Sequence, residues 1–535
     1  MTAEPVVQPS KSTGKIARSA GTVSVAVMCS RVLGLIREQV FAGLFGAGFA
    51  IDAFVVAFRV PNLLRDLFAE GALSAAFVTV FTDYSANRGS EATWRLASNV
   101  MVFFALLISV FTLAGIYWAE PIVNLLAPDF GSIPGKTELT VQLTRIMMPF
   151  LLCVSLAAVV MGILNTKGRF FVPAMSSAFF NIGSIVGGLS LALLFPRFGQ
   201  PAIAGMAWGT LIGGLLQLLV QTPALFKVGF RFQFACNPLD PGVRRILLLM
   251  LPAVIGLSAT QINIFVNTNF AASCGEGSVS WLNYAFRLVQ LPIGVFGVAL
   301  SIAVMPVLAR QAAQKDLASL KQTFTSSLVL VFALAVPATA GLMLLARPII
   351  RLIFEHGVFT GADTIQTADA LTCYAIGLFA YSAIKVMVPV FYAINNTRYP
   401  VIGSFLGVGA NICIILLVID AFQHRGIALA TSCAMILNFL FLGAVLYRKL
   451  DGYPLGYLLR GLAKIVAATG LMYGGIWGME HLLGPWQQGS MAAQIGIMAV
   501  LIGVAVIVYG VGLYVLRLPE CILLTGKLVQ RVRRS

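Results

Sequence analysis

The sequence predicts an all-α polytopic membrane protein. Of its 535 residues, 59% are hydrophobic and only 10% are charged, whereas soluble chains carry roughly a quarter charged residues. The apolar residues gather in runs of about 20, the length that a helix needs to cross the hydrocarbon core of a bilayer. A net charge of +16 in so apolar a chain is typical of basic loops on the cytoplasmic side of a membrane. This composition excludes a disordered chain and a nucleic-acid-binding protein.

Fourteen membrane spans can be placed along the chain from the length and composition of its apolar runs. They cover residues 24–46, 51–83, 96–118, 141–164, 172–195, 202–226, 245–271, 280–308, 324–346, 367–394, 400–420, 426–447, 459–481 and 493–516. The second span is broken by Pro61 and by the charged pair Arg65 and Asp66, and the eighth is interrupted by Pro292. Broken helices at membrane depth are tolerated only where protein packs around them or where they line a wet cavity. Spans 2 and 8 are therefore predicted either to be packed in protein or to line a wet cavity.

The loop charges predict the orientation of these spans. The connections on the side of the N-terminus carry 23 lysine and arginine residues. Those on the opposite side carry only Lys136, Arg197, Arg347, Arg351 and Arg425. Basic loops remain in the cytoplasm, so we expect an even number of spans with both termini cytoplasmic. Residues 1–23 and 518–535 are accordingly predicted to be cytoplasmic tails, the second of them basic.

An internal repeat divides the chain. Three short segments of the first half recur in the second half, at offsets of 228, 231 and 230 residues. The matched segments are 57–59 with 285–287 (Ala-Phe-Arg), 165–166 with 396–397 (Asn-Thr) and 181–182 with 411–412 (Asn-Ile). Because six spans separate equivalent positions, the two copies share one orientation and are related by a pseudo-twofold axis along the membrane normal. This predicts two six-helix lobes, 24–228 and 242–450, around a central cavity, with two further helices in residues 455–517.

Ionisable side chains inside the spans are the strongest indication of function. The cations among them are Arg31, Arg37, Arg59, Arg65, Arg145, Arg287 and Lys385, and the carboxylates are Glu38, Asp52, Asp66 and Glu70. An arginine at the bilayer centre costs about 2.5–3.5 kcal/mol even on a lenient insertion scale. One interpretation is that these charges pair with one another and only fasten helices together. The excess of cations favours a second interpretation, an anionic ligand, and the guanidinium fork suits a phosphate group.

No pattern in the sequence indicates catalysis. The eight cysteines are scattered and lie mostly in apolar runs, and the three histidines fall in short polar connections. The chain contains no zinc-protease, serine-hydrolase or nucleotide-binding signature. We therefore expect no catalytic residue, no metal site and no cofactor.

Spans 1, 2, 7 and 8 contain several distinctive motifs. They are residues 30–34 (Ser-Arg-Val-Leu-Gly), Arg37, 45–48 (Phe-Gly-Ala-Gly), 52–54 (Asp-Ala-Phe), 59–65 (Arg-Val-Pro-Asn-Leu-Leu-Arg), 68–72 (Phe-Ala-Glu-Gly-Ala), 278–281 (Ser-Val-Ser-Trp) and 284–288 (Tyr-Ala-Phe-Arg-Leu). These motifs resemble those of one known family, the MurJ (MviN) lipid II flippases. The resemblance is dense over the first 90 residues and collinear along the whole chain.

The resemblance implies a fold, a substrate and a set of residues. The fold is that of the multidrug/oligosaccharidyl-lipid/polysaccharide exporter superfamily. The substrate is lipid II, the undecaprenyl-diphosphate-linked disaccharide-pentapeptide of peptidoglycan synthesis. By motif position, the residues that match the family's functional cavity arginines are Arg31, Arg37, Arg65 and Arg287, and those that match its functional carboxylates are Asp52 and Glu70. Phe286 stands where the family often has an acidic residue, and Thr79 where a proline is common. Spans 7 and 11 contain no acidic residue, so no sodium site is predicted.

These observations together predict a flippase of the bacterial cytoplasmic (inner) membrane that works by alternating access. It would carry lipid II from the cytoplasmic to the periplasmic leaflet, in contact with membrane lipids and with the cell-wall synthesis machinery. Glu38, Asp52 and Glu70 would act as a gate, by pairing with cavity arginines in one state and releasing them in another; the alternative is a constant ion pair that stabilises the fold. Residues 455–517 would form either a groove for the lipid tail or a plain helical hairpin.

Two other functions stay open at this point. One is a flippase for another polyprenyl-diphosphate oligosaccharide, such as an O-antigen, although the motif of the first span argues against it. The other is a membrane glycosyltransferase, which would need clustered catalytic carboxylates in the outer connections. Those connections contain only dispersed acidic residues.

Overall fold

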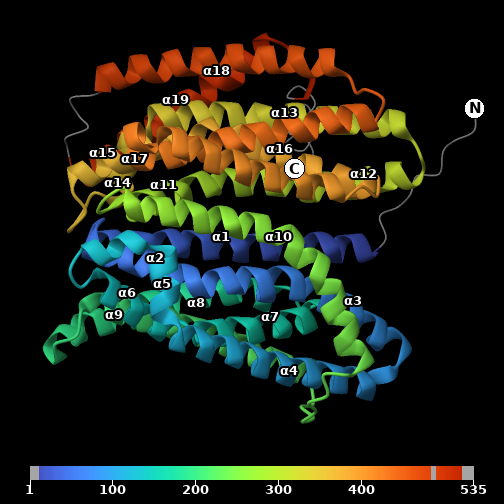
Figure 1. Ribbon diagram of the computed structural model, residues 1–535. Helices are drawn as coiled ribbons and strands as arrows, with labels where there is room; N and C mark the ends of the chain where they lie inside the picture. Colours follow the sequence, from blue (N-terminus) through green and yellow to red (C-terminus); the bar gives the residue numbers. More distant parts are fainter. Residues whose placement is uncertain (1–10, 484–489, 521–535) are drawn as a thin grey trace, which may run out of the picture. The chain divides into compact units, whose positions relative to one another are not determined.

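The computed structural model describes residues 11–483 and 490–520, and every regular element in these ranges is helical (Figure 1). The chain divides into two compact units, Met1–Ser273 and Cys274–Ser535. Among the described residues, ten helices are long and apolar enough to cross a membrane. The number is eleven if α15 (Gly361–Ile376) and α16 (Leu378–Ala393), which are bent by 42° against each other, are counted together as one span. The predicted class, an all-α multi-pass membrane protein, is therefore confirmed.

From residue 11 onwards, the first unit contains ten α-helices and three short helical turns. The helices are α1 (Lys11–Phe45), α2 (Phe49–Arg65), α3 (Ala72–Asn87), α4 (Gly89–Tyr117), α5 (Ala119–Leu126), α6 (Lys136–Met147), α7 (Phe150–Thr166), α8 (Phe171–Leu194), α9 (Ala202–Lys227) and α10 (Pro241–Ser273). The turns are η1 (Asp66–Gly71), η2 (Pro128–Ser132) and η3 (Phe195–Phe198).

The second unit contains, in its described part, nine α-helices and one short helical turn. They are α11 (Ser278–Pro292), η4 (Ile293–Val298), α12 (Ala299–Ala313), α13 (Leu317–Leu344), α14 (Ala346–Phe354), α15 (Gly361–Ile376), α16 (Leu378–Ala393), α17 (Arg398–Lys449), α18 (Leu455–Leu483) and α19 (Met491–Val515).

The number of spans depends on how broken helices are counted, and the figure of fourteen stays a prediction. Predicted spans 11 and 12 both lie in α17, in which Gln423 has non-helical angles (φ 49°, ψ −136°) that divide it into two helices. Predicted span 2 corresponds to α2, η1 and α3 together; α2 has 17 residues and α3 has 16. Each is shorter than the roughly 20 residues of one full crossing. A span that consists of such short helices is therefore not counted among the ten long apolar helices.

The breaks predicted in spans 2 and 8 are π-helical turns. The turn η1 covers Asp66–Gly71 and the turn η4 covers Ile293–Val298. They are 227 residues apart, close to the offsets of 228 to 231 residues of the sequence repeat. A proline precedes each: Pro61 lies inside α2 and Pro292 ends α11. Such turns widen a helix locally and are frequent at functional sites, so the two repeats share the same irregularity at the same position.

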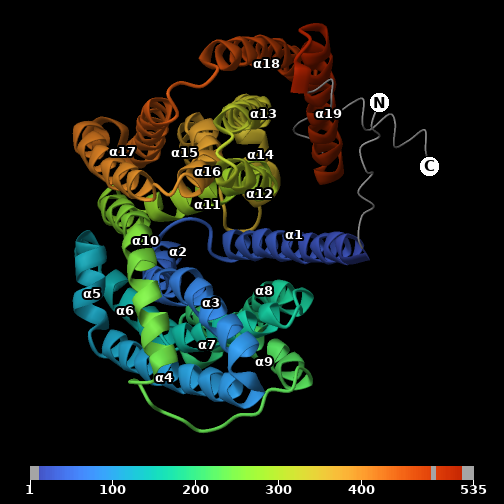
Figure 2. The ribbon, with the colours of Figure 1, turned by 90° about the vertical axis from the view of Figure 1, so that its right-hand side faces the viewer.

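Small residues allow α8 and α9 to pack against each other (Figures 1 and 2). A Cβ atom added to Gly209 would lie 2.4 Å from the Cα of Gly188, and one added to Gly205 would lie 2.3 Å from the backbone nitrogen of Ala192. Without the hydrophobic effect between them, helices in lipid gain stability mainly from such close contact.

The connection between α9 and α10 is fastened to α4. The side-chain amide of Asn99 donates to the carbonyl oxygen of Asn237 (2.9 Å), and the backbone nitrogen of Asn237 donates back to Oδ1 of Asn99 (2.8 Å). The backbone nitrogen of Gln233 donates to the hydroxyl of Ser98 (3.1 Å). The segment that links the two sequence repeats is thus held by side chains of α4 that are otherwise buried.

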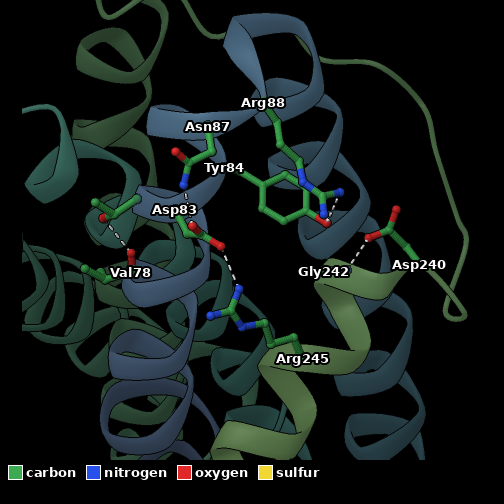
Figure 3. Close-up of polar contacts among 9 residues, drawn as sticks. Val78, Asp83, Tyr84, Asn87, Arg88, Asp240, Gly242 and Arg245 are labelled. Atoms are coloured by element: carbon green, nitrogen blue, oxygen red, sulfur yellow. Dashed lines mark hydrogen bonds and ion pairs between the residues drawn. The ribbon is translucent and has the colours of Figure 1, made fainter.

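Helix α10 lies in the first unit, although the sequence repeat assigns it to the second lobe. At its start Arg245 pairs with Asp83 of α3 at 2.6 Å (Figure 3). Near its end the amide of Asn269 donates to the carbonyl oxygen of Leu125 in α5 (3.1 Å). The predicted lobe boundaries follow the sequence repeat, whereas these contacts place α10 with the elements that precede it.

In the second unit, α18 and α19 pack on each other and α18 packs on α13 (Figure 1). Ile465 and Ala468 of α18 share a buried cluster with Val329 and Phe332 of α13. The hydroxyl of Tyr509 in α19 donates to the carbonyl oxygen of Ala333 (2.6 Å). The two C-terminal helices are therefore packed on each other and on α13 within the second unit. Their role as a groove for a lipid tail stays a prediction.

Candidate functional site

Helix α1 presents two of the predicted cavity arginines to different surroundings. Arg31 is partly buried, and within the described part of the chain it has neither a hydrogen-bond partner nor an ion-pair partner. Arg37 is buried and pairs with the neighbouring carboxylate Glu38 at 2.8 Å. An unpartnered guanidinium in an apolar helix is costly unless water or an anion meets it. Arg31 is thus the arginine that is best prepared to receive a ligand.

Helix α8 holds the part of α1 that carries these arginines. The amide of Asn181 donates to the carbonyl oxygen of Ser30 (3.1 Å), next to Arg31. The guanidinium of Arg37 lies 5.4 Å from the ring centroid of Phe180, within the range of a cation–π interaction. In the sequence, Asn181 is distinguished only by its match with Asn411 in the internal repeat. That match is the one sequence feature that could have indicated its contact with α1.

Arg65, at the end of α2, is held by the residue that follows it. Its Nε and one terminal nitrogen donate to Oδ1 of Asp66, at 3.2 Å and 2.9 Å. The other oxygen of Asp66 accepts from the side-chain amide of Gln261 in α10 (3.4 Å). The side chains of Arg65 and Asp66 are 23% and 27% exposed, so this ion pair lies where water or a ligand can reach it.

Asp52 is completely buried, and the structure pairs it with a cation that the sequence did not connect to it. Its Oδ2 lies 3.0 Å from Nζ of Lys136, at the start of α6. In the sequence, Lys136 is one of five cations in the loops opposite the N-terminus. The expected partners of the gate carboxylates were the cavity arginines. No local pattern indicates a pair that is 84 residues apart in the chain. Only the packing of α2 against α6 brings these two side chains together.

The remaining carboxylates of the predicted gate differ in what the structure describes. Glu38 is bound to Arg37, the residue before it. Glu70 belongs to the turn η1, but its side chain lies outside the described part of the structure. The proposed role of Glu70 in a gate therefore stays a prediction. The same role of Glu38 also stays a prediction, and it would involve the ion pair with the adjacent Arg37.

Arg287 and Lys385 lie in the second unit, on α11 and α16, and both are exposed. Within the described residues Lys385 has no hydrogen-bond or ion-pair partner. Phe286, which stands in place of the acidic residue common in the family, has its ring centroid 5.2 Å from that of Tyr374 and 6.4 Å from that of Tyr381. The side chain that precedes Arg287 thus packs among aromatic rings.

The four predicted cavity arginines are distributed over both units. The first unit carries Arg31, Arg37 and Arg65, and the second carries Arg287. Over residues 11–483 and 490–520, no group of three or more histidine, cysteine, aspartate or glutamate side chains is arranged so that it could hold a metal ion. What the described side chains offer is guanidinium and ammonium groups, which bind anions.

Comparisons with known proteins agree with this chemistry. The family model described as "Lipid II flippase MurJ" matches residues 41–496. The chain is 37% identical over 456 residues to a probable lipid II flippase MurJ of Rhizobium meliloti, with 84% of each chain covered. It is 35% identical to the lipid II flippase MurJ of Burkholderia cenocepacia, over 85% of this chain and 88% of that relative.

Solved structures support the same assignment. A structure described as "Lipid II flippase MurJ, inward closed conformation" matches with a TM-score of 0.77 and 28% identity, over 93% of this chain and 99% of the other. An inward-facing transporter of the multidrug resistance MATE family matches with a TM-score of 0.62 and 17% identity, over 80% of this chain and 95% of the other; this likeness concerns the fold alone. The resemblance noted in the sequence is thus confirmed, and the chain belongs to the MurJ family of lipid II flippases.

Proposed function

We propose that this protein carries lipid II from the cytoplasmic to the periplasmic leaflet of the bacterial inner membrane by alternating access. Relatives that share a third of its residues over most of its length are named lipid II flippases. The observation that carries the proposal is Arg31, a guanidinium on an apolar helix that has no hydrogen-bond or ion-pair partner among the residues that the structure describes. Moving a lipid head group breaks no covalent bond, so the proposed activity requires neither a catalytic residue nor a cofactor.

In this proposal the diphosphate of lipid II is the anion that the arginines receive. Arg31 offers a guanidinium with no partner in the described part of the chain, and its fork geometry matches two phosphate oxygens. Arg37 and Arg65 are bound to Glu38 and Asp66. An arriving phosphate would compete with these carboxylates for the same guanidinium groups. The substrate would then make different contacts in the two conformations, with and without the carboxylates on these arginines. A ligand can drive a change of conformation only if its contacts differ between the two states.

Arg287 is proposed as the contact from the second unit, where it belongs to the same repeat motif as Arg59. The polyprenyl tail would remain in lipid or lie along α18 and α19. Enzymes of cell-wall synthesis would take up lipid II at the periplasmic face and would be the partners of this protein.

The decisive experiment is complementation. A bacterium depleted of its own lipid II flippase should grow when it produces this protein, and lipid II should again become accessible to a probe at the outer leaflet. Rescue of growth without exposure of lipid II would contradict the proposal, as would a normally abundant protein that fails to rescue.

The proposed orientation, with both termini in the cytoplasm, can be tested by cysteine labelling in a chain without its eight native cysteines. A cysteine at Gly361, the first residue of α15, should react with an impermeant reagent from outside. A cysteine at Ser90 in the first turn of α4 should react only after the membrane is opened. Ser90 is preferred to its neighbour Gly89, because Gly89 has φ 79°, which strains any other residue. The reverse labelling pattern would overturn the orientation that the loop charges predict.

Lys385 provides a graded test of the anion site. Because its ammonium group is exposed, one contact of this kind is worth about 0.2–1 kcal/mol. Lys385→Ala should therefore slow the exposure of lipid II by roughly 1.4- to 5-fold, and Lys385→Arg should preserve the rate. Initial rates in cells with matched protein levels provide the measurement. An unchanged rate for Lys385→Ala would place this lysine outside the path of the substrate.

A further inference from the structure

The ion pair between Lys136 and Asp52 is almost completely buried in the described part of the first unit. Both side chains are 1% exposed, and Nζ of Lys136 lies 3.0 Å from Oδ2 of Asp52. The same ammonium group lies 4.3 Å from the ring centroid of Phe130 and 6.0 Å from that of Phe49. Lys136 is thus enclosed by one carboxylate and two aromatic rings.

The pair joins the first turns of two helices, each of which follows a glycine turn. Asp52 lies in the first turn of α2, shortly after Gly46 (φ 66°). Lys136 is the first residue of α6 and follows Gly135 (φ 80°). Positive φ angles at glycine permit sharp changes of chain direction that other residues resist. The two helices are therefore free to meet at an angle, and the ion pair fixes where they meet.

Fastening two helices does not by itself require a buried ion pair. Removing both charges from water costs much of what their attraction returns, and apolar residues of similar volume often hold such a contact equally well or better. An ion pair differs from an apolar contact in one respect: it separates readily once water or another charge reaches it. An ion pair therefore suits a contact between two helices that must be stable in one conformation and must separate in another.

We infer that Lys136 is the residue through which Asp52 acts during transport, as a positioning residue for α2. The inference rests on the proposed function. Asp52 lies at one end of α2 and Arg65 at the other, a distance of about 20 Å along the helix axis. A change in how the first turn of α2 meets α6 therefore moves Arg65, which the proposal places at the diphosphate. The pair closes in one state and opens in the next, and Phe130 and Phe49 line the place to which Lys136 returns.

The test separates holding from releasing with four variants of the pair. Lys136→Met and Asp52→Asn each leave one charge buried without its partner, and both should lower protein abundance and lipid II exposure. The double variant Asp52→Leu/Lys136→Met removes both charges. It should recover abundance and thermal stability in detergent, but it should expose lipid II at least tenfold more slowly than the unaltered protein. The exchanged pair Asp52→Lys/Lys136→Asp should recover both stability and transport in part.

The pair of Asp83 and Arg245 is the matched control, because it also joins two helices of the first unit but is exposed (39% and 54%). The variant Asp83→Leu/Arg245→Met should expose lipid II at a rate close to that of the unaltered protein. Normal transport by the apolar Asp52/Lys136 double variant would show that the pair is a static fastener and would overturn the inference. A stable exchanged pair without transport would also overturn it, because Asp52 would then act by its own charge. Failure of the proposed function would be recognised separately, since the unaltered protein would then fail to rescue a flippase-depleted cell.

Discussion

Replacing Arg31 by alanine is expected to abolish rescue of a flippase-depleted bacterium while the protein remains in the membrane at normal abundance. Because Arg31 has no partner within the described residues, its removal leaves no buried carboxylate behind. The fold should therefore be unaffected. Removing one charge-assisted contact to a diphosphate in a partly dry site costs about 2–5 kcal/mol, which corresponds to a loss of transport of roughly 30- to 5,000-fold.

Three companion variants give this experiment its controls. Arg31→Lys should restore part of the activity, because the ammonium group keeps the charge but loses the fork of donors. Arg37→Ala should lower abundance as well as transport, because it leaves Glu38 buried without the guanidinium that now lies 2.8 Å away. Arg197→Ala, at an exposed position in η3, should behave like the unaltered protein. Full rescue by Arg31→Ala at normal abundance would reduce Arg31 to an incidental charge.

Replacing Gly209 by alanine is expected to deplete the folded protein from the membrane. The new methyl group would lie 2.4 Å from the Cα of Gly188 and 2.7 Å from the carbonyl oxygen of Ser184. Both neighbours are backbone atoms, which cannot rotate away, so α8 and α9 must separate. Overpacking of this kind costs about 1–3 kcal/mol, and more where the backbone has to move. Membrane abundance and the midpoint of thermal aggregation in detergent should both fall.

Gly256 provides the matched control for Gly209. It also lies inside a helix of the first unit, α10, but a Cβ atom added there would meet nothing within 4 Å. Gly256→Ala should therefore leave abundance unchanged or raise it slightly, since alanine is the better helix former. Equal abundance of the two alanine variants would contradict the interpretation that glycine is required for the approach of α8 to α9.

The class of protein, the breaks in its helices and its family could all be predicted from the sequence, because each depends on residues that are close together in the chain. Hydropathy over about 20 residues indicates a span, and a proline such as Pro61 or Pro292 interrupts a helix wherever that helix is placed. The two π-helical turns follow from these prolines and from the repeat, and the structure has them at Asp66–Gly71 and Ile293–Val298. The predicted cation excess in the spans likewise needed only a count along the sequence.

What the tertiary structure decided is which charge meets which partner. The sequence placed Asp52 among the gate residues but could not connect it with Lys136, which is 84 residues away. The repeat assigns α10 to the second lobe, and that boundary stays a prediction; the contact between Arg245 of α10 and Asp83 of α3 could likewise not be predicted from the sequence. The physical reason is the same in both cases. Contacts between distant residues depend on how far each helix is rotated and shifted against its neighbours, and no pattern of neighbouring residues along the chain specifies that.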